Sequence, residues 1–234
     1  MSLASASAPF IDAVEHWVKN LPVMKLADAV RDPDRTAILS VDLINGFCTI
    51  GPLASPRVHG IVAPAAALFQ AAHDLGVRHF VLTQDTHLPD EVEFGQYPPH
   101  ALAGTPESET VPELENLPFS GLYYVIQKHS LSSSANRRLD HWLDEHPHVN
   151  TFIVAGDCSD LCTYQLAMHL RLRANEFHRH DVRVILPENC VQTYDTPVDT
   201  ALELGIPPHH GDLLHALFLF NMANNGVEVV ARLE

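Results

Sequence analysis

Cys162 lies in a sequence context that suits a nucleophilic thiol. It stands in the segment Val-Ala-Gly-Asp-Cys-Ser-Asp-Leu-Cys-Thr, residues 154–163, where an apolar run meets a turn of small residues and a helical pattern follows. This order predicts that Cys162 lies at the C-terminal end of a buried strand and at the N-terminus of a helix. Backbone N–H groups and the helix dipole favour thiolate there and could bind a developing oxyanion. Cys162 is therefore a candidate nucleophile, with a small buried core residue as the alternative interpretation.

Asp42 and Lys128 offer the partners that such a thiol needs, because each follows a different apolar, strand-like run. A carboxylate can take the proton of a thiol, and a nearby ammonium group would keep the carboxylate ionised and stabilise the thiolate. The backbone N–H groups of Cys158 and Cys162 are the candidate oxyanion donors. Together these residues predict acyl transfer through a thioester. The alternative for Lys128 is a solvated surface charge.

A second group of residues has the composition of a metal site. Asp85 and His87 stand two apart on an extended segment, so their side chains point to the same side. Glu93 and His100 follow in the same stretch of sequence, and Glu91 is a rival to Glu93. Carboxylate and imidazole ligands of this kind suit one divalent first-row metal ion, either Zn, Fe or Mn. A solvated loop charge is the alternative for Glu93, and a turn residue for His100.

The elements that must position these residues alternate along the chain. Short β-rich apolar runs occupy residues 37–41, 77–82, 123–126, 151–155, 182–186 and 227–230. Helical patterns occupy residues 61–75, 135–145, 161–174, 198–204 and 213–224. Near-continuous apolar strands between helices predict an α/β fold, with a mainly parallel six-stranded sheet as the middle of three α/β/α layers. Ligands bind at the carboxyl ends of the strands in such sheets, which is where the candidate residues stand.

The bulk properties predict one domain and exclude some classes of partner. We expect a single domain over residues 36–234, preceded by an N-terminal helical extension over residues 1–35. The formal net charge of −15 argues against nucleic acid and anionic membranes as partners. No signal-peptide pattern or apolar stretch of about 20 residues is seen, and the cysteines show no framework spacing, so we expect a cytoplasmic location. The apolar leader and the run 213–220 favour a homo-oligomer.

Two further segments are given simple interpretations. The Pro-rich stretch 88–118 is too rich in specific residues for a tether, so we expect a long functional loop. His209 and His210 follow two prolines, and a loop before the last helix is favoured there over a metal role.

These residues resemble the isochorismatase-like cysteine hydrolases, and within them the nicotinamidase and pyrazinamidase branch. The resemblance covers about residues 37–190 and rests on five pieces of sequence. They are Asp-Leu-Ile-Asn-Gly-Phe at 42–47, Thr-Gln-Asp-Thr-His at 83–87, Pro-Pro-His-Ala-Leu-Ala-Gly-Thr at 98–105, Lys128, and Gly-Asp-Cys-Ser-Asp-Leu-Cys at 156–162.

The resemblance implies a role for each candidate residue. The implied catalytic triad is Asp42, Lys128 and Cys162. Further implied features are a metal held by Asp85, His87, Glu93 and His100, substrate-binding aromatic rings at Phe47 and Tyr97, and a cis peptide between Asp157 and Cys158. The implied reaction converts nicotinamide to nicotinate and ammonia, with the metal orienting the pyridine nitrogen.

The chain also departs from the family pattern. The opening at 42–47 lacks the usual Gln and second Asp, and Ala101 stands where nicotinamidases often carry Cys. These departures bear on the substrate rather than on the triad. The alternative functions are hydrolysis of another small amide or carbamoyl compound, and an interaction module that keeps the fold without activity.

Overall fold

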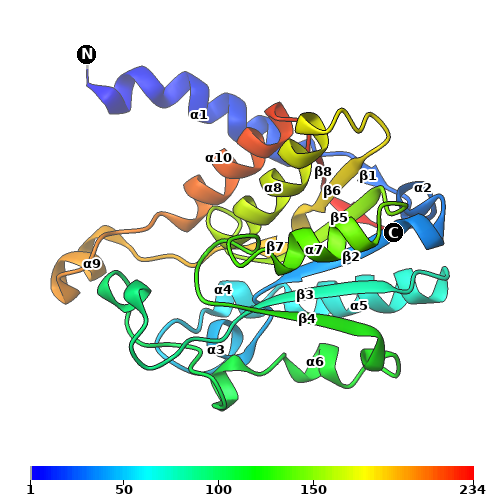
Figure 1. Ribbon diagram of the computed structural model, residues 1–234. Coiled ribbons are helices and arrows are strands. Elements are labelled where there is room, and N and C mark those ends of the chain that lie inside the picture. The colour runs from blue at the N-terminus through cyan, green and yellow to red at the C-terminus, as the bar shows by residue number, and fades with distance from the viewer. Residues whose placement is uncertain (1) are drawn as a thin grey trace.

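A seven-stranded parallel sheet forms the centre of the protein (Figure 1). The computed structural model describes residues 2–234. The strands are β2 (Thr36–Val41), β3 (His79–Asp85), β4 (Tyr123–Lys128), β5 (Thr151–Asp157), β6 (Arg183–Pro187), β7 (Val191–Gln192) and β8 (Glu228–Val230). Their order is β4-β3-β2-β5-β6-β8, and β7 pairs with β5 beyond the end of β6. All six predicted strands are present. The additional strand, β7, has only two residues and is too short to show a periodic pattern.

Helices cover both faces of this sheet (Figure 1). They are α1 (Leu3–Lys19), α2 (Leu26–Val30), α3 (Asn45–Cys48), α4 (Pro56–His59), α5 (Val62–Asp74), α6 (Pro112–Glu115), α7 (Arg138–Glu145), α8 (Cys162–Glu176), α9 (Val198–Leu204) and α10 (Gly211–Asn224). Two short strands, β1 (Val23–Met24) and β9 (Arg232–Leu233), form a separate parallel pair.

Alternate residues of β2 face two different core layers. Leu39 packs with the buried side chains of α7, α8 and α10, whereas Ile38 packs with those of α2 and α5. Every residue of β2 is buried, because helices cover both of its faces and strands flank both of its edges. This explains the near-continuous apolar sequence of the strand and confirms the three-layer α/β/α architecture.

The central strands approach one another closely at the carboxyl edge of the sheet. Gly156 of β5 pairs with Val41 of β2 and has a φ of +118°. A Cβ atom at this position would lie 2.0 Å from the carbonyl oxygen of Val41. Glycine therefore meets two demands here, a backbone conformation that L residues rarely adopt and contact with the neighbouring backbone.

The segment before residue 36 packs against the C-terminal part of the chain. Phe10 and Trp17 of α1 contact Phe220 of α10, with ring centroids 5.8 and 5.3 Å apart. The pairing of β1 with β9 adds a second connection. The extension predicted for residues 1–35 thus contains α1, β1 and α2, and α2 packs into the core with α5 as a third connection.

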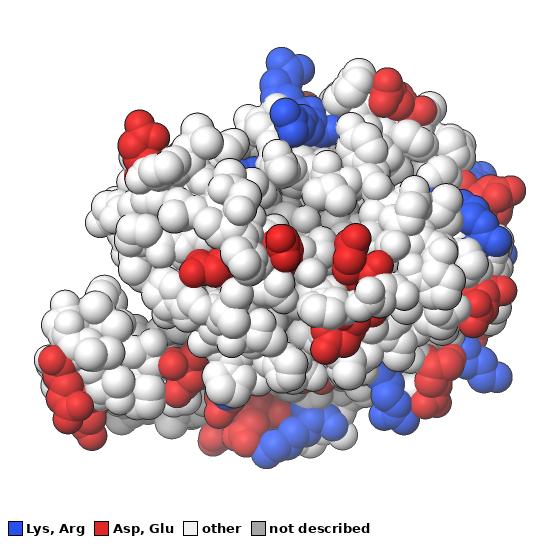
Figure 2. All heavy atoms as spheres, turned by 90° about the horizontal axis from the view of Figure 1, so that it is seen from below, with Lys and Arg blue, Asp and Glu red and all other residues white. Residues whose placement is uncertain are grey.

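Within residues 2–234, no helix is both long enough and apolar enough to span a bilayer. On the face shown in Figure 2, acidic and basic side chains lie in small groups with uncharged residues between them. The negative charge of this face is therefore spread over it rather than gathered in one block.

Candidate active site

Asp42, Lys128 and Cys162 come together at the carboxyl edge of the sheet, although 86 and 34 residues separate Lys128 from the other two. The Lys128 Nζ atom lies 2.7 Å from Asp42 Oδ2 and 3.8 Å from Cys162 Sγ. It also donates to Asp85 Oδ1 at 2.6 Å. All four side chains are buried. A buried ammonium group requires such partners, and Lys128 is therefore not the solvated charge of the alternative interpretation.

The ends of three adjacent strands hold this group in place. Asp42 follows β2, and its Oδ1 atom accepts a hydrogen bond from the backbone N–H of Asp85 at 2.8 Å. Asp85 in turn pairs with Lys128 in the ladder between β3 and β4. Asp42 has a φ of +56°, a left-handed conformation that turns the chain out of the sheet. The side chains are thus fixed by the sheet rather than by mobile loops.

Burial and charge set the protonation of the group. Burial raises the pKa of the Cys162 thiol, while Lys128 opposes this effect. Burial and the charge of Asp85 raise the pKa of Asp42 to about 6, again against the effect of Lys128. For Asp85, Lys128 and the two neighbouring histidines outweigh burial and lower the pKa. A protonated thiol beside a carboxylate that titrates near neutrality is a suitable proton donor and acceptor pair.

Cys162 is the first residue of α8, as the sequence predicts. The preceding turn is closed by the N–H groups of Leu161 and Thr163, which both donate to the carbonyl oxygen of Cys158 at 3.0 Å. The N–H groups of Cys158 and Cys162 donate to no other group within residues 2–234. The peptide between Asp157 and Cys158 is cis, as the resemblance implies. Two free N–H groups thus lie within the turn that leads to the thiol.

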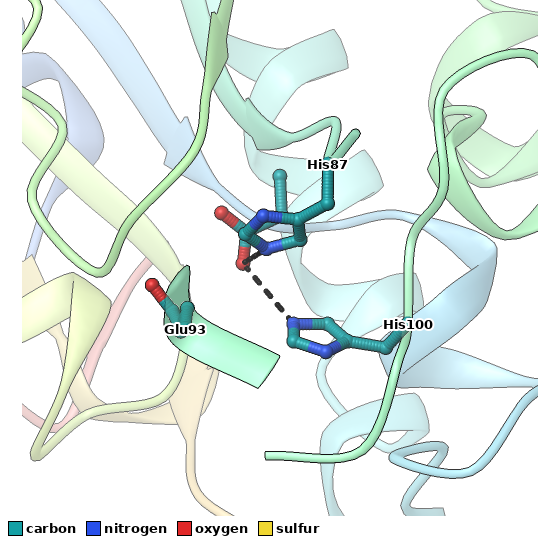
Figure 3. A group of neighbouring side chains, drawn as sticks. His87, Glu93 and His100 are labelled. Atoms are coloured by element: carbon teal, nitrogen blue, oxygen red, sulfur yellow. Dashed lines mark ion pairs between the residues drawn. The ribbon is translucent and has the colours of Figure 1, made fainter. Parts of the chain in front are cut away.

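Asp85, His87, Glu93 and His100 form a compact group beside the thiol. Each offers one ligand atom, and these four atoms lie within 4.8 Å of one another. His87 Nε2 and His100 Nε2 lie 3.6 and 3.9 Å from Asp85 Oδ2, and Figure 3 shows Glu93 across from the two rings. The structure thus brings together the four residues that the sequence offers as metal ligands.

The loop 88–118 returns to the end of β3 and brings His100 to this group. The His87 N–H donates to the Ala101 carbonyl at 2.9 Å, and the Ala103 N–H donates to the His87 carbonyl at 2.9 Å. This short ladder places His100 beside His87, with ring centroids 4.6 Å apart. The other ring nitrogen of His100, Nδ1, contacts the carbonyl oxygen of Pro98 at 2.8 Å, which orients the ring.

The donor set fits a divalent metal ion. His87 is 0% exposed, and neither of its ring nitrogens has a hydrogen-bond partner among the described residues. An unsatisfied buried imidazole costs free energy, and a metal ion would satisfy it. Two imidazoles with two carboxylates are ligands that Zn, Fe and Mn accept.

Glu91 and Glu93 have different surroundings. Glu91 accepts from the Leu88 N–H at 3.0 Å, and its Oε1 lies 2.8 Å from His129 Nδ1. Glu91 forms a separate group with His87 and the exposed His129, and this group includes neither Asp85 nor His100. Glu93 belongs to the four-residue group with His87 and is half-buried. The geometry therefore favours Glu93 as the fourth ligand.

The two predicted aromatic residues both lie near His100. The rings of Phe47 and Tyr97 have centroids 5.5 and 6.3 Å from that of His100, and both are partly buried. Burial, followed by electrostatic effects of the nearby Cys162 and Glu93, raises the pKa of Tyr97. Tyr97 thus lies near both the thiol and the metal-ligand group.

The structure also shows contacts that the sequence interpretation missed. Ser159 and Asp160, inside the cysteine turn, contact His215 and His209 at 2.8 and 2.7 Å. His209 does lie before α10, as predicted, but it is buried rather than part of an open loop. About fifty residues separate each pair, and no spacing in a single sequence indicates such contacts.

The sequence profile of the isochorismatase domain matches residues 36–231. Nicotinamidase 1 of Arabidopsis thaliana is 28% identical over 233 residues, with 92% of this chain and 93% of that protein covered. This relative and the chain therefore correspond over nearly their whole lengths.

Solved structures with this fold are similar to the chain. The N-carbamoylsarcosine amidase from Thermoplasma acidophilum has a TM-score of 0.58 and 25% identity over 72% of this chain and 88% of that one. The pyrazinamidase of Pyrococcus horikoshii, solved in complex with zinc, has a TM-score of 0.62 and 19% identity over 84% and 98%. The profile match and the arrangement of the site together show that the chain belongs to the isochorismatase family of hydrolases.

Proposed function

We propose that the protein hydrolyses nicotinamide to nicotinate and ammonia through a thioester on Cys162. The observation that carries this proposal is the buried contact of Lys128 with both Asp42 and Cys162, next to a four-residue metal-ligand group. A thiol, a base and a site for a pyridine nitrogen are the three parts that this reaction needs. The similarity to Nicotinamidase 1 supports the same substrate.

In the first half of the reaction, Asp42 takes the proton of the thiol as Cys162 Sγ attacks the amide carbon. The oxyanion accepts hydrogen bonds from the N–H groups of Cys158 and Cys162. Asp42 then gives its proton to the leaving nitrogen, and ammonia departs. Lys128 stabilises the negative charge that moves between the thiolate and the carboxylate.

In the second half, water attacks the thioester and gives its proton to Asp42. The tetrahedral intermediate collapses, the bond to sulfur breaks, and the new carboxylic acid leaves and loses its proton to solvent, which gives nicotinate. The proton on Asp42 returns to Cys162, which restores the starting state. Asp42 thus serves as base and acid in turn, as suits a carboxyl group with a raised pKa.

Asp85, His87, Glu93 and His100 would hold one divalent metal ion, with zinc preferred. Bound there, the ion would supply a Lewis-acid site for the pyridine nitrogen or its water. Phe47 and Tyr97 would lie against the faces of the pyridine ring. Asp85 would belong both to the metal ligands and to the surroundings of the triad, because it also contacts Lys128 at 2.6 Å.

A carbamoyl or ureido compound is the second candidate substrate. The similarity to an N-carbamoylsarcosine amidase favours it, and so does the departure of residues 42–47 from the nicotinamidase pattern. The same thiol, base and oxyanion donors would serve this reaction. The metal-ligand group favours nicotinamide, since a carbamoyl group has no ring nitrogen to orient.

A substrate panel with metal control distinguishes these functions. Ammonia release is measured from nicotinamide, pyrazinamide and N-carbamoyl amino acids, before chelation, after chelation and after zinc is restored. We expect nicotinamide to be the preferred substrate. Its turnover should be lost after chelation and restored when zinc is returned. Faster turnover of the carbamoyl compounds would select the second candidate. Nicotinamide turnover without any metal would contradict the ligand assignment.

We also propose that the enzyme acts in NAD salvage in the cytoplasm, as one domain over residues 36–234 with a helical extension. A homo-oligomer is proposed because α1 exposes Leu3 and Phe10, which are 84% and 51% exposed. Light scattering after size-exclusion chromatography tests this, and a monomer at micromolar concentration would contradict it.

A further inference from the structure

The turn that carries the candidate oxyanion donors is held by two histidines from the C-terminal part of the chain. Ser159 Oγ lies 2.8 Å from His215 Nδ1, and Asp160 Oδ2 lies 2.7 Å from His209 Nε2. All four side chains are buried. Ser159 and Asp160 are consecutive and lie between Cys158 and Cys162. Any movement of these two residues therefore moves the donors.

Each histidine is itself held from its other ring nitrogen. His209 Nδ1 lies 3.0 Å from the carbonyl oxygen of Tyr194, and the two rings stack with centroids 3.8 Å apart. His215 Nε2 lies 3.4 Å from Glu188 Oε1. A ring fixed at both nitrogens has little freedom to rotate, as with histidines oriented by a second partner in other sites.

Ser159, His215 and Glu188 have the residue types of a hydrolytic triad, but the geometry does not suit that role. Ser159 is 0% exposed, whereas Cys162 keeps 5% of its surface exposed, so of the two only Cys162 has surface that a substrate can reach. The Ser159 backbone N–H donates to the Gln192 carbonyl at 2.9 Å, and its hydroxyl group contacts His215, so both polar groups already have partners within the protein. A nucleophile must instead be accessible to the reacting carbon. The chain of contacts is therefore suited to holding the turn.

We propose that His209 and His215 are positioning residues that fix the turn 158–161 and thereby place the oxyanion donors for Cys162. We call these two residues the histidine clamp. The inference rests on the proposed function for its effect on the reaction, whereas the holding of the turn does not depend on any substrate. Hydrogen-bond donors stabilise a transition state only when they are held in place beforehand, and small displacements lower the rate strongly.

The chemistry of the contacts selects the test variants. A Gln side chain reaches about as far as His Nε2, so His209→Gln keeps a donor for Asp160. An Asn side chain reaches about as far as His Nδ1, so His215→Asn keeps a partner for Ser159. Ala removes the contact in both cases. His169→Ala is the matched control, because His169 Nε2 contacts Asp140 at 2.9 Å between α8 and α7, in a pair that does not contact the turn.

Hydrogen exchange tests the clamp without any substrate. The N–H groups of Ser159, Leu161 and Thr163 are hydrogen-bonded at 2.9, 3.0 and 3.0 Å, so they report on the turn. We expect exchange in a peptide over residues 158–163 to be about tenfold faster in His209→Ala and His215→Ala, and unchanged in His169→Ala. If an Ala variant does not fold, amide variants give the same comparison. His209→Gln and His215→Asn keep the contacts with the turn, whereas His209→Asn and His215→Gln place the amide at the wrong distance. Equal exchange in all variants would overturn the clamp.

Steady-state kinetics then test its effect on the reaction. We expect kcat for nicotinamide to fall about tenfold or more in the Ala variants with KM changed less than about threefold, and to recover in His209→Gln and His215→Asn. A change in KM with kcat unaltered would overturn the positioning role. So would a kcat that does not recover in His209→Gln and His215→Asn. If the wild type releases no ammonia from nicotinamide, the proposed function fails, and the exchange experiment alone decides the clamp.

Discussion

Lys128 organises the charges of the site at the scale of single residues. Its ammonium group lies between the carboxylates of Asp42 and Asp85 at 2.7 and 2.6 Å, and Cys162 Sγ lies 3.8 Å away. Those two carboxylates would repel each other if the cation were absent. Burial of the three charged groups is tolerated only because they are paired.

Lys128→Met should therefore destabilise the protein as well as inactivate it. Two buried carboxylates would remain without their cation, at about 3–5 kcal/mol in the free energy of unfolding. Chemical denaturation measures this loss. Lys19→Met is the control, because the Lys19–Glu15 pair is exposed and solvent screens it, so its loss should barely change stability. Equal stability of the two variants would contradict the structural role of Lys128.

The two glutamates of the loop 88–118 should differ in their effect on metal binding. Glu93→Gln replaces a proposed ligand, so zinc affinity should fall about tenfold to a hundredfold. Glu91→Gln changes the contacts with the Leu88 N–H and with His129 and should leave the affinity within about threefold. Zinc titration in competition with a chromophoric chelator measures both. A larger loss in Glu91→Gln than in Glu93→Gln would show that Glu91 is the ligand.

At the scale of elements, the carboxyl ends of β2, β3, β4 and β5 bring the site together. Gly156 lets β5 lie against β2 at this edge, where a Cβ atom would collide with the Val41 carbonyl at 2.0 Å. The close approach of two strands therefore depends on one residue without a side chain.

Gly156→Ala should accordingly separate these strands or prevent folding. The positive φ and the collision with the backbone both oppose Ala, and the loss should be about 3 kcal/mol or more. Thermal unfolding measures it. Gly121→Ala is the control, because a Cβ atom added there would meet no other atom within 4 Å and the φ of Gly121 is not in the left-handed region. A Gly156→Ala protein as stable as Gly121→Ala would contradict this account.

Local sequence predicts the elements better than the contacts between them. The strand-ending residues Asp42, Asp85 and Lys128 could be placed together, because parallel strands end at a common edge. Two other features could not be predicted, namely the two-residue strand β7 and the contact between His209 and Asp160. The first is too short to show a period, and the second joins segments whose relative position depends on the packing of α10.

At the scale of the whole molecule, the carboxyl and amino edges of the sheet differ in role, the first in the reaction and the second in stability. The candidate site occupies the carboxyl edge. At the amino edge, Asp181 connects three loops, accepting from Arg35 at 3.2 Å, Asn150 at 3.1 Å and Arg179 at 3.1 Å. Hydrogen bonds from Arg179 and Asn150 lower the pKa of Asp181. Substitutions at this edge should change stability without changing kcat.

Asp181→Asn gives a pH-dependent test of that expectation. Because the folded protein lowers the pKa of Asp181, its contribution is complete above the ordinary aspartate value of about 4 and declines as the pH falls below it. The variant should be less stable than the wild type at pH 7, by less than about 1 kcal/mol since the carboxylate is partly exposed, and the difference should shrink towards pH 2. A difference that grows on acidification would contradict the pairing.

Ammonia release by Cys162→Ala tests the central claim most directly. The wild type should convert nicotinamide to equal amounts of nicotinate and ammonia. Cys162→Ala should be at least about a thousandfold slower while remaining folded, because no thioester can form. Cys190→Ala removes another buried thiol and should keep most of the activity. Turnover by Cys162→Ala at the wild-type rate would contradict the account.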